Sequence, residues 1–362
     1  MTNPRFSAIR PIAALALAGA VFAGPAGRGL LAQDPTVRFG TKVPSDVKVI
    51  YERGLRFLVE SQQDDGSWST SGDRYAGKGS TGVTGLCVMA FLASGEDPNF
   101  GRYSSNVRRG VRQIMLAQDL KTGYLPGSMY HHGFAMLGLS EAYGMVDDSA
   151  LWGGSEPKEH RRTIGQALDL AVRCAVTAQK NNQFGGWRYS PKDSSADTSV
   201  SGAVLVGLLA ARNAGIEVPD KTVDKALAYF RSNTSKEGVV AYSGGLGGFG
   251  ASMNRSAIAT LVFAIGKKKD WEEYGAARDY ITARLEHRER SYPQYFRYYM
   301  AQALFQGDYD AWRRWNRETI RLLKNAQLEN GSFASQRGIA YGTSMSLLAL
   351  ALNYRFLPIY ER

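Results

Sequence analysis

The sequence of 362 residues has only two cysteines, no strand-like alternation of useful length and, after its first residues, no apolar run long enough to span a membrane. Cys87 and Cys174 each lie in an apolar helical pattern without a surrounding motif, which favours buried packing residues over a disulfide or a nucleophile. The missing alternation argues against β-structure. These absences leave an all-α soluble fold as the expectation.

The N-terminus has the pattern of a secretory signal peptide. Arg5 and Arg10 make a positive start, and residues 12–23 are apolar but too short to cross a bilayer comfortably. Small residues lead to a cleavage site after Ala32, with Ala23 as the earlier option. We therefore expect residues 1–32 to be removed and residues 33–362 to be an exported domain, periplasmic or secreted; the alternative is an uncleaved membrane anchor.

Positive charge is in excess but scattered. The net charge is +11, and loss of Arg5, Arg10 and Arg28, with no acid among the first 32 residues, would leave +8. Residues 267–269 form the only lysine run, which is typical of a solvated loop. The excess favours acidic polymers or anionic surfaces, but the scatter indicates no nucleic-acid partner.

A short sequence motif, called the phrase below, recurs along the chain: a glutamine, a few polar residues, a glycine and an aromatic residue. An amphipathic helix precedes each copy, as in the stripe Ile50, Gly54, Phe57 and Leu58. A helix that is apolar nearly all round follows, as in residues 83–92, and such helices are buried on every side. The copies stand at residues 62–68, 118–124, 179–187 and 327–333. Repeats at this spacing predict stacked supersecondary units.

Two further helical pairs complete the pattern. The unit at residues 230–238 keeps only the glycine of the phrase, and the unit at residues 280–305 lacks it altogether. Counting both gives six pairs, each with a polar outer and an apolar inner helix. This predicts an (α/α)6 toroid. The glycine would permit the turn, the glutamine would bond loose backbone groups, and the aromatic residue would cover the end of the barrel.

The phrase resembles the repeat of the squalene cyclase, oxidosqualene cyclase and protein prenyltransferase β-subunit superfamily. Its closest copies are residues 54–68, 179–187 and 327–333, and the resemblance covers residues 45–355. It implies a terpenoid cyclase-type α/α toroid whose cavity holds an isoprenoid or another apolar small molecule. An enzyme of this kind would be a terpene cyclase/mutase-like isomerase or would carry out prenyl-group chemistry.

Two departures weaken the family's best-known reactions. The Asp-x-Asp-Asp-Thr-Ala acid motif of squalene-hopene cyclases falls on residues 194–199, where Ala196 replaces the proton donor and only Asp197 remains. Alkene protonation needs a strong acid in a dry pocket, which alanine cannot supply. The chain has residues for one barrel, like a prenyltransferase β-subunit, yet the Asp, Cys and His of that group's zinc site have no clean match.

Candidate site residues lie where the inner helices begin, because parallel inner helices bring their N-termini to one mouth. Asp197 and His132 are the catalytic candidates, although Asp197 also suits a helix N-cap. Adjacent histidines on a helix point about 100° apart and rarely share an ion, so we expect no metal and no cofactor. The ligand-binding candidates are Trp187, Tyr130, His131, Asn254, Arg255, Arg297, Tyr298 and Tyr341.

Three functions remain open at this point. The first is an exported single-barrel protein that binds an isoprenoid or other apolar ligand. The second is a non-catalytic scaffold whose mouth docks a peptide or partner protein. The third is a polysaccharide lyase on acidic glycans, for which Asn254, Arg255, His132 and Tyr298 would supply base and charge neutraliser. Residues 242–250 hold a formal G-x-G-x-x-G, but no strand precedes it, so a loop at the mouth is expected.

Overall fold

The computed structural model describes residues 43–68, 80–152, 158, 161–243, 250 and 252–360. The expected signal peptide and most of the glycine-rich stretch lie outside the described residues. No helix among these residues is long and apolar enough to cross a membrane.

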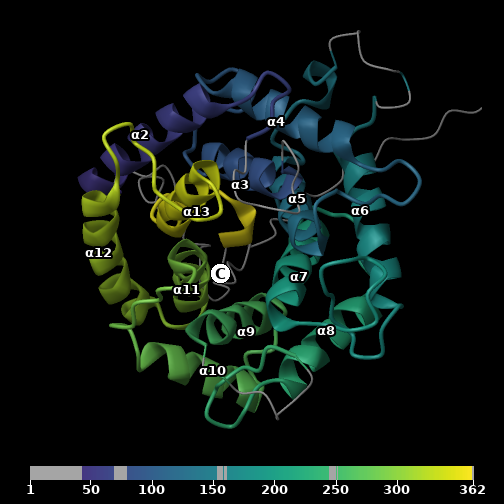
Figure 1. Cartoon of the computed structure of the whole chain (residues 1–362), viewed down its shortest axis with the longest axis vertical. Coiled ribbons are helices and arrows are strands. Elements are labelled where there is room, and N and C mark those ends of the chain that lie inside the picture. Colours follow the sequence, from purple (N-terminus) through teal and green to yellow (C-terminus); the bar gives the residue numbers. More distant parts are fainter. Residues whose placement is uncertain are drawn as a thin grey trace, which may run out of the picture.

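Six outer and six inner helices alternate along the described chain and confirm the predicted toroid (Figure 1). The outer helices are α2 (Ser45–Ser61), α4 (Ser104–Ala117), α6 (Ile164–Gln179), α8 (Asp220–Ser232), α10 (Glu272–Thr282) and α12 (Tyr309–Ala326). The inner helices are α3 (Thr81–Leu92), α5 (Met129–Ala142), α7 (Thr198–Asn213), α9 (Met253–Ile265), α11 (Pro293–Gly307) and α13 (Ile339–Ala351).

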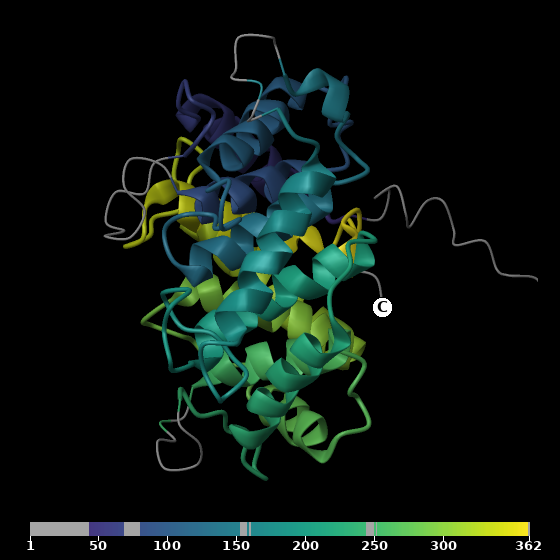
Figure 2. The same cartoon turned by 90° about the vertical axis from the view of Figure 1, so that its right-hand side faces the viewer.

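The ring closes on itself in both layers. Each inner helix packs against the next, and α13 returns to α3, while α12 lies beside α2. Every residue of α3 is buried, whereas α12 buries only one face, which is the difference between inner and outer helices that their apolar patterns predict. Figure 2 shows the outer helices from the side, covering the inner layer.

The glutamine of the phrase joins neighbouring units. Gln62 Nε2 donates to the carbonyl of Gly66 at 3.0 Å and to the carbonyl of Asn106 on the next outer helix, α4, at 3.0 Å. Gln327 Nε2 makes the corresponding bonds to Gly331 at 2.8 Å and to Ile50 on α2 at 2.9 Å, so it helps to close the ring. The same pair of bonds is made by Gln118 and Gln179.

The phrase glycine also meets the next outer helix. Gly123 has a φ of +75°, and a Cβ there would lie 2.1 Å from the carbonyl oxygen of Leu170 on α6. Gly331 has a φ of +85° and approaches Arg53 on α2 in the same way, at 2.3 Å. Both the left-handed backbone and the close approach exclude a side chain at these positions.

The aromatic residue is buried in three copies of the phrase, as Trp68, Trp187 and Phe333, and Tyr124 is half-buried. Trp68 donates its indole N–H to the carbonyl of Leu58 at 2.8 Å, and Trp187 donates to Ala175 at 2.8 Å. Each acceptor belongs to the outer helix of the same unit. The tryptophans therefore bind outer helix to loop, because a buried indole N–H requires an acceptor.

The C-terminal segment lies at the C-terminal ends of the inner helices. Phe356 packs on Gly95, just beyond α3, and Leu357 and Ile359 are buried. The 3-10 turn η4 (Pro358–Tyr360) contacts α7. This places the segment on the face opposite the inner-helix N-termini.

Candidate functional site

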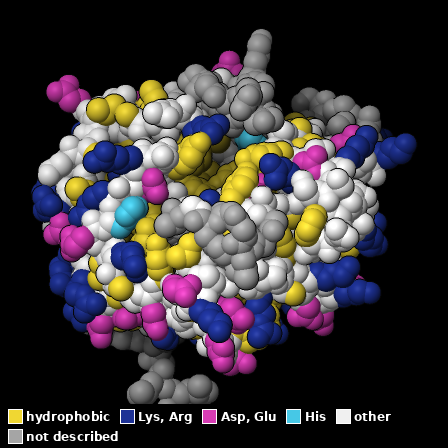
Figure 3. All heavy atoms as spheres, turned by 60° about the horizontal axis from the view of Figure 1, so that its bottom comes forward, with side chains coloured by type: hydrophobic (Ala, Val, Ile, Leu, Met, Phe, Trp, Pro, Cys, Tyr) yellow, Lys and Arg dark blue, Asp and Glu magenta, His cyan; other side chains and the backbone are white. Residues whose placement is uncertain are grey.

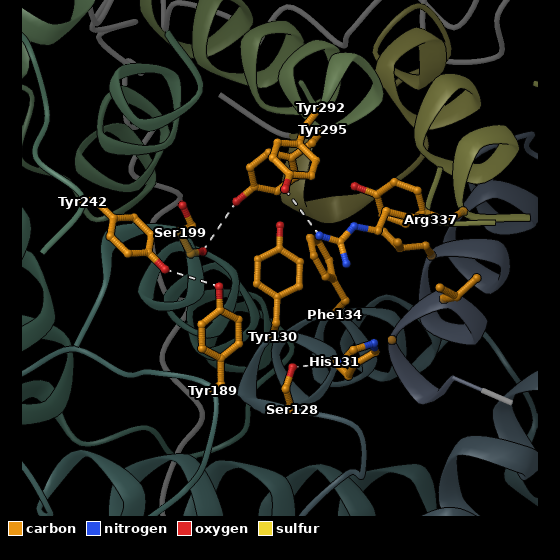
Figure 4. Close-up of a pocket in the computed structure, with 14 residues that line it drawn as sticks. Ser128, Tyr130, His131, Phe134, Tyr189, Ser199, Tyr242, Tyr292, Tyr295 and Arg337 are labelled. Carbon is orange, nitrogen blue, oxygen red and sulfur yellow. Dashed lines mark hydrogen bonds between the residues drawn. The ribbon is translucent and has the colours of Figure 1, made fainter. Parts of the chain in front are cut away.

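A cavity of about 430 Å³ lies at the N-terminal ends of the inner helices. Figure 4 shows side chains from several helices converging on it, and the face in Figure 3 has a hollow rich in hydrophobic-class side chains, tyrosine included. Six tyrosines line it together with an arginine and a histidine. The described lining residues are Gly82, Val83, Leu86, Ser128, Tyr130, His131, Phe134, Tyr189, Ser199, Tyr242, Tyr292, Tyr295, Arg337 and Tyr341.

Tyr130 stands near the middle of the cavity in Figure 4, on the first turn of α5. Its ring lies 5.1 Å from that of Phe134 and 5.8 Å from that of Tyr295 on α11, centroid to centroid. Burial, and then the neighbouring tyrosines, raise the pKa of Tyr130 well above its ordinary value. Burial likewise raises the pKa of Tyr295. Both phenols therefore stay protonated and can donate hydrogen bonds at neutral pH.

Arg337 and His131 bring basic groups to one side of the cavity. Arg337 lies in the loop before α13, with its guanidinium 5.5 Å from the ring centre of Tyr292 and Nη2 donating to the Tyr292 hydroxyl at 3.4 Å. His131 Nδ1 and Ser128 Oγ are 2.9 Å apart. A cation, an imidazole and several phenols thus face one space.

The opposite wall is formed by Tyr189 and Tyr242, whose hydroxyls are 3.3 Å apart. Backbone bonds hold both residues: Met129 N donates to the carbonyl of Tyr189 at 2.8 Å, and Thr198 N donates to that of Tyr242 at 2.9 Å. Because the donors belong to the starts of α5 and α7, two inner helices set the position of this wall.

Asp197 is buried and caps α7. Its Oδ1 accepts from Val200 N at 2.8 Å, while no hydrogen-bond partner for Oδ2 lies among the described residues. Burial raises the pKa of Asp197 to about 6, against the hydrogen bond from Val200 and the charge of Arg188, which both lower it. The carboxyl lies near Tyr242 and Tyr229, and Asp197 is not among the residues that line the cavity.

His132 is fully buried and ties a loop to a helix. Leu125 N donates to Nδ1 at 3.1 Å, so Nε2 carries the proton and donates to the carbonyl of Ala171 at 3.0 Å. Burial lowers the pKa of His132 to about 4. The ring is therefore neutral at pH 7, and it connects the second unit to α6.

Three of the ten predicted site residues line the cavity: Tyr130, His131 and Tyr341. Asn254 and Tyr298 are buried, and each has a polar atom without a partner among the described residues. Arg255 donates Nε to the carbonyl of Val240 at 2.8 Å and Nη2 to Gly250. Trp187 does not line the cavity and is bonded to the Ala175 carbonyl on α6. Burial lowers the pKa of Arg297.

The sequence reasoning missed four wall residues: Arg337, Tyr292, Tyr189 and Tyr242. Each lies in a loop before or between helices, whereas the predicted set was drawn mainly from helix starts. Their aromatic and basic character beside each inner-helix start was the available signal. Among the described residues, no group of three or more His, Cys, Asp or Glu side chains is placed to hold a metal ion.

Comparison of the sequence with models of known families and with curated proteins gave no match. The likeness to the squalene cyclase and prenyltransferase repeat therefore rests on the quoted phrases alone. Solved structures, in contrast, share the fold across most of the chain.

The similar structures are enzymes of about this length. An α-1,6-mannanase, GH76A of Salegentibacter sp. HEL1_6, solved as an inactive variant with two aspartates replaced and in complex with α-1,6-mannotriose, matches at a TM-score of 0.59 and 8% identity over 85% of this chain and 98% of its own. A D-mannose isomerase matches at 0.58 and 11%, over 85% and 96%. An unsaturated glucuronyl hydrolase specific for heparin matches at 0.54 and 11%, over 85% and 96%. At such identities the likeness defines the class, an α/α toroid.

Proposed function

We propose that the protein binds an acidic glycan in the tyrosine-lined cavity and cleaves it by β-elimination. One observation carries the proposal: Arg337, His131 and six tyrosines share one cavity, and no aspartate or glutamate is among its described lining residues. A uronate offers a carboxylate for the arginine and hydroxyls for the phenols. The sugar ring offers apolar C–H faces for the aromatic rings.

The polarity of the wall favours a sugar over an isoprenoid. A hydrocarbon in the cavity would offer no hydrogen-bond partner to the tyrosine hydroxyls and the Arg337 guanidinium that line it, which costs about 1–3 kcal/mol for each group left unsatisfied. A saccharide replaces the water with its own hydroxyls. Phe134, Val83 and Leu86 still give the cavity an apolar part, which is usual in ligand sites.

The missing carboxylates favour elimination over hydrolysis. Most glycoside hydrolases need two carboxyl groups on either side of the scissile bond. Asp197, which lies close to Tyr242 of the wall, is buried and engaged as an N-cap. Elimination beside a uronate needs instead a cation to stabilise the charge that develops on the carboxylate, a base and a proton donor.

We assign these three proposed roles to groups that line the cavity. Arg337 pairs with the uronate carboxylate. His131 takes the proton from the carbon next to that carboxylate as the C–H bond breaks, and a carbon–carbon double bond forms. The bond to the leaving glycosidic oxygen breaks, and Tyr130, which burial keeps protonated, gives that oxygen its proton. Solvent then restores both groups, so no further reactant is needed.

The similar structures support a saccharide ligand. One of them holds α-1,6-mannotriose and another is a glucuronyl hydrolase specific for heparin, and both share this toroid with low identity. The excess of basic residues in the sequence also suits an acidic polymer. We further propose that the protein is exported, where such polymers occur; N-terminal sequencing of the protein recovered outside the cytoplasm tests this.

The test is a screen of the purified protein against polygalacturonate, alginate and hyaluronan, followed by ultraviolet absorbance of the unsaturated uronate product. We expect product from at least one polymer. Arg337→Gln should raise KM and lower kcat, and Tyr130→Phe should lower kcat by about 100-fold, the size typical of a lost general acid. Arg321→Gln is the control, because Arg321 lies on outer helix α12 in an exposed ion pair with Glu318.

Three results would overturn the proposal. The first is wild-type protein that yields no unsaturated product from any of these polymers. The second is an isoprenoid found in the protein by native mass spectrometry after purification, which would favour the terpenoid function suggested by the repeat. Full activity in Arg337→Gln and Tyr130→Phe together would show that the cavity is not the site.

A further inference from the structure

Arginines stand on two opposite sides of the cavity, each stacked on a tyrosine of its wall. On one side the Arg337 guanidinium is 5.5 Å from the ring centre of Tyr292. On the other, Arg188 and Arg255 are 5.8 Å and 6.0 Å from the ring centre of Tyr242. Figure 4 shows Tyr242 and Arg337 on opposite sides of Tyr130. Arg337 is itself a lining residue of the cavity, whereas Arg188 and Arg255 lie over the ring of the lining residue Tyr242.

The wall around Tyr242 is a built surface. Arg188 lies over the rings of both Tyr189 and Tyr242, and the two tyrosine hydroxyls are 3.3 Å apart. Arg255 is held by its bond to the carbonyl of Val240. Stacking and backbone bonds thus restrict these long side chains before any ligand arrives. Less conformational entropy is therefore lost when a ligand binds.

Two guanidinium groups, those of Arg188 and Arg255, lie beside this wall. Neither forms an ion pair with another described residue. Asp197 is the nearby carboxylate; it lies buried behind the wall with Oδ1 bound to Val200 N. Asp193 accepts from Ser190 N in its own loop. The Arg188 and Arg255 guanidinium groups thus lie beside Tyr242 of this wall, with neither carboxylate bound to them.

We propose that Arg188, Tyr189, Tyr242 and Arg255 form a second subsite for an acidic sugar, separate from the one at Arg337. The inference rests on the proposed function of the cavity. The ligand is then an acidic oligosaccharide that crosses the mouth, with one uronate carboxylate at Arg337 and another, on a sugar beyond Tyr130, at Arg188. The protein acts within a chain and not on a terminal disaccharide.

The test measures affinity against chain length, with di-, tetra- and hexasaccharides of galacturonate, of alginate and of hyaluronan titrated calorimetrically into the wild type. Ultraviolet absorbance of the same samples shows whether cleavage occurs during the titration, and where it does, Tyr130→Phe replaces the wild type as the reference in every comparison. We expect the tetrasaccharide of the recognised polymer to bind at least tenfold more tightly than its disaccharide. Arg188→Gln should remove that gain and leave disaccharide affinity unchanged. Arg337→Gln should weaken all lengths. Arg188→Lys, which keeps the charge, should restore part of the gain.

Controls separate folding from binding. Arg173→Gln, on outer helix α6 and exposed, should behave as wild type at every length. Arg188 lies near Asp197, so the melting temperature of Arg188→Gln is measured as well. Because a misfolded variant would lose disaccharide binding too, unchanged disaccharide affinity shows that the fold is intact.

The two proposals fail differently. Wild-type protein that binds no acidic oligosaccharide of any length overturns both. Wild-type protein that cleaves a uronate polymer but binds tetrasaccharide and disaccharide equally overturns only the second subsite. The same holds if Arg188→Gln weakens all lengths alike.

Discussion

The second and fifth units of the ring differ in what their loops do. The second carries the glutamine and glycine of the phrase: Gln118 donates to Ala167 on the next outer helix, and Gly123 packs closely against Leu170 of that helix. The fifth lacks the phrase, and its loop places Tyr292 in the cavity wall, followed by Tyr295 on α11. The glutamine of the phrase is occupied in joining units, and the cavity takes its side chains from residues outside the phrase, such as Tyr292 here and Arg337 in the sixth unit. The repeat thus marks the ring, and residues outside it form the site.

The largest effect should follow from blocking the contact of a phrase glycine. Gly123→Ala adds a Cβ 2.1 Å from the Leu170 carbonyl at a φ of +75°, and we expect a loss of about 3 kcal/mol or more in the free energy of unfolding. Gly144→Ala is the matched control: its φ is +79° but no atom lies within 4 Å, so only about 1 kcal/mol should be lost. Urea denaturation measures both, and equal losses would contradict the role given to the phrase.

The free energy of unfolding should depend on pH in opposite directions through His132 and Asp197. His132 joins two units of the ring, whereas Asp197 is buried close to the cavity wall. The pKa of His132 is about 4 when folded against 6.5 ordinarily, so the unfolded state binds more protons and stability rises with pH across that interval. The pKa of Asp197 is about 6 against 3.8, so its contribution is present at low pH and is lost as pH rises to 6. Each amounts to about 3 kcal/mol.

These opposing contributions should nearly cancel in the wild type between pH 4 and 6. His132→Gln should then leave stability falling as pH rises, and Asp197→Asn should leave it rising. Denaturation midpoints at several pH values measure the slopes. Identical slopes in the two variants would mean that neither group titrates as its burial indicates.

A smaller loss should follow from removing a glutamine of the phrase. Gln118→Met leaves the buried carbonyls of Gly123 and Ala167 without this donor, which should cost about 2 kcal/mol. Gln294→Met is the comparison, because Gln294 makes one exposed bond, to Ala334, between the fifth and sixth units, and should cost about 0.5 kcal/mol. A larger loss of stability in Gln294→Met than in Gln118→Met would contradict the role given to the glutamine of the phrase.

A comparable or smaller loss than that of Gln118→Met should come from Trp187→Phe, which removes the indole bond to the Ala175 carbonyl and costs about 1–2 kcal/mol. Because Trp187 does not line the cavity, glycan affinity should stay at the wild-type value. Tyr130→Phe should do the opposite, with an unchanged melting temperature and weaker activity. Isothermal titration and thermal melts on the same samples test the pair.

The fold was predictable because its signals are local. The stripe of Ile50, Gly54 and Leu58 needs only the helical period, and the same holds for the apolar helix that follows. The location of a site at the inner-helix N-termini followed from the parallel packing of these helices. Tyr130, His131 and Tyr341, each at or near a helix start, were therefore on the predicted list and line the cavity.

The rest of the site depends on contacts between distant residues. Tyr189 joins the wall because Met129 N holds its carbonyl, and Tyr242 does so because Thr198 N holds its own. Asp197 and His132 have the composition of a catalytic pair, but their partners are backbone groups, Val200 N for one and Leu125 N and Ala171 O for the other. No spacing in the sequence specifies such partners.

The sequence by itself determined a ring of six helical pairs, the turns that connect them and the end at which polar residues gather, because hydrophobic periodicity and glycine act within a few residues. The tertiary structure decided which of those polar residues face the cavity. That choice depends on burial and on hydrogen bonds from the neighbouring unit. Of two adjacent histidines, His131 therefore lines the cavity, whereas His132 is buried and bonded to Ala171 of the next unit.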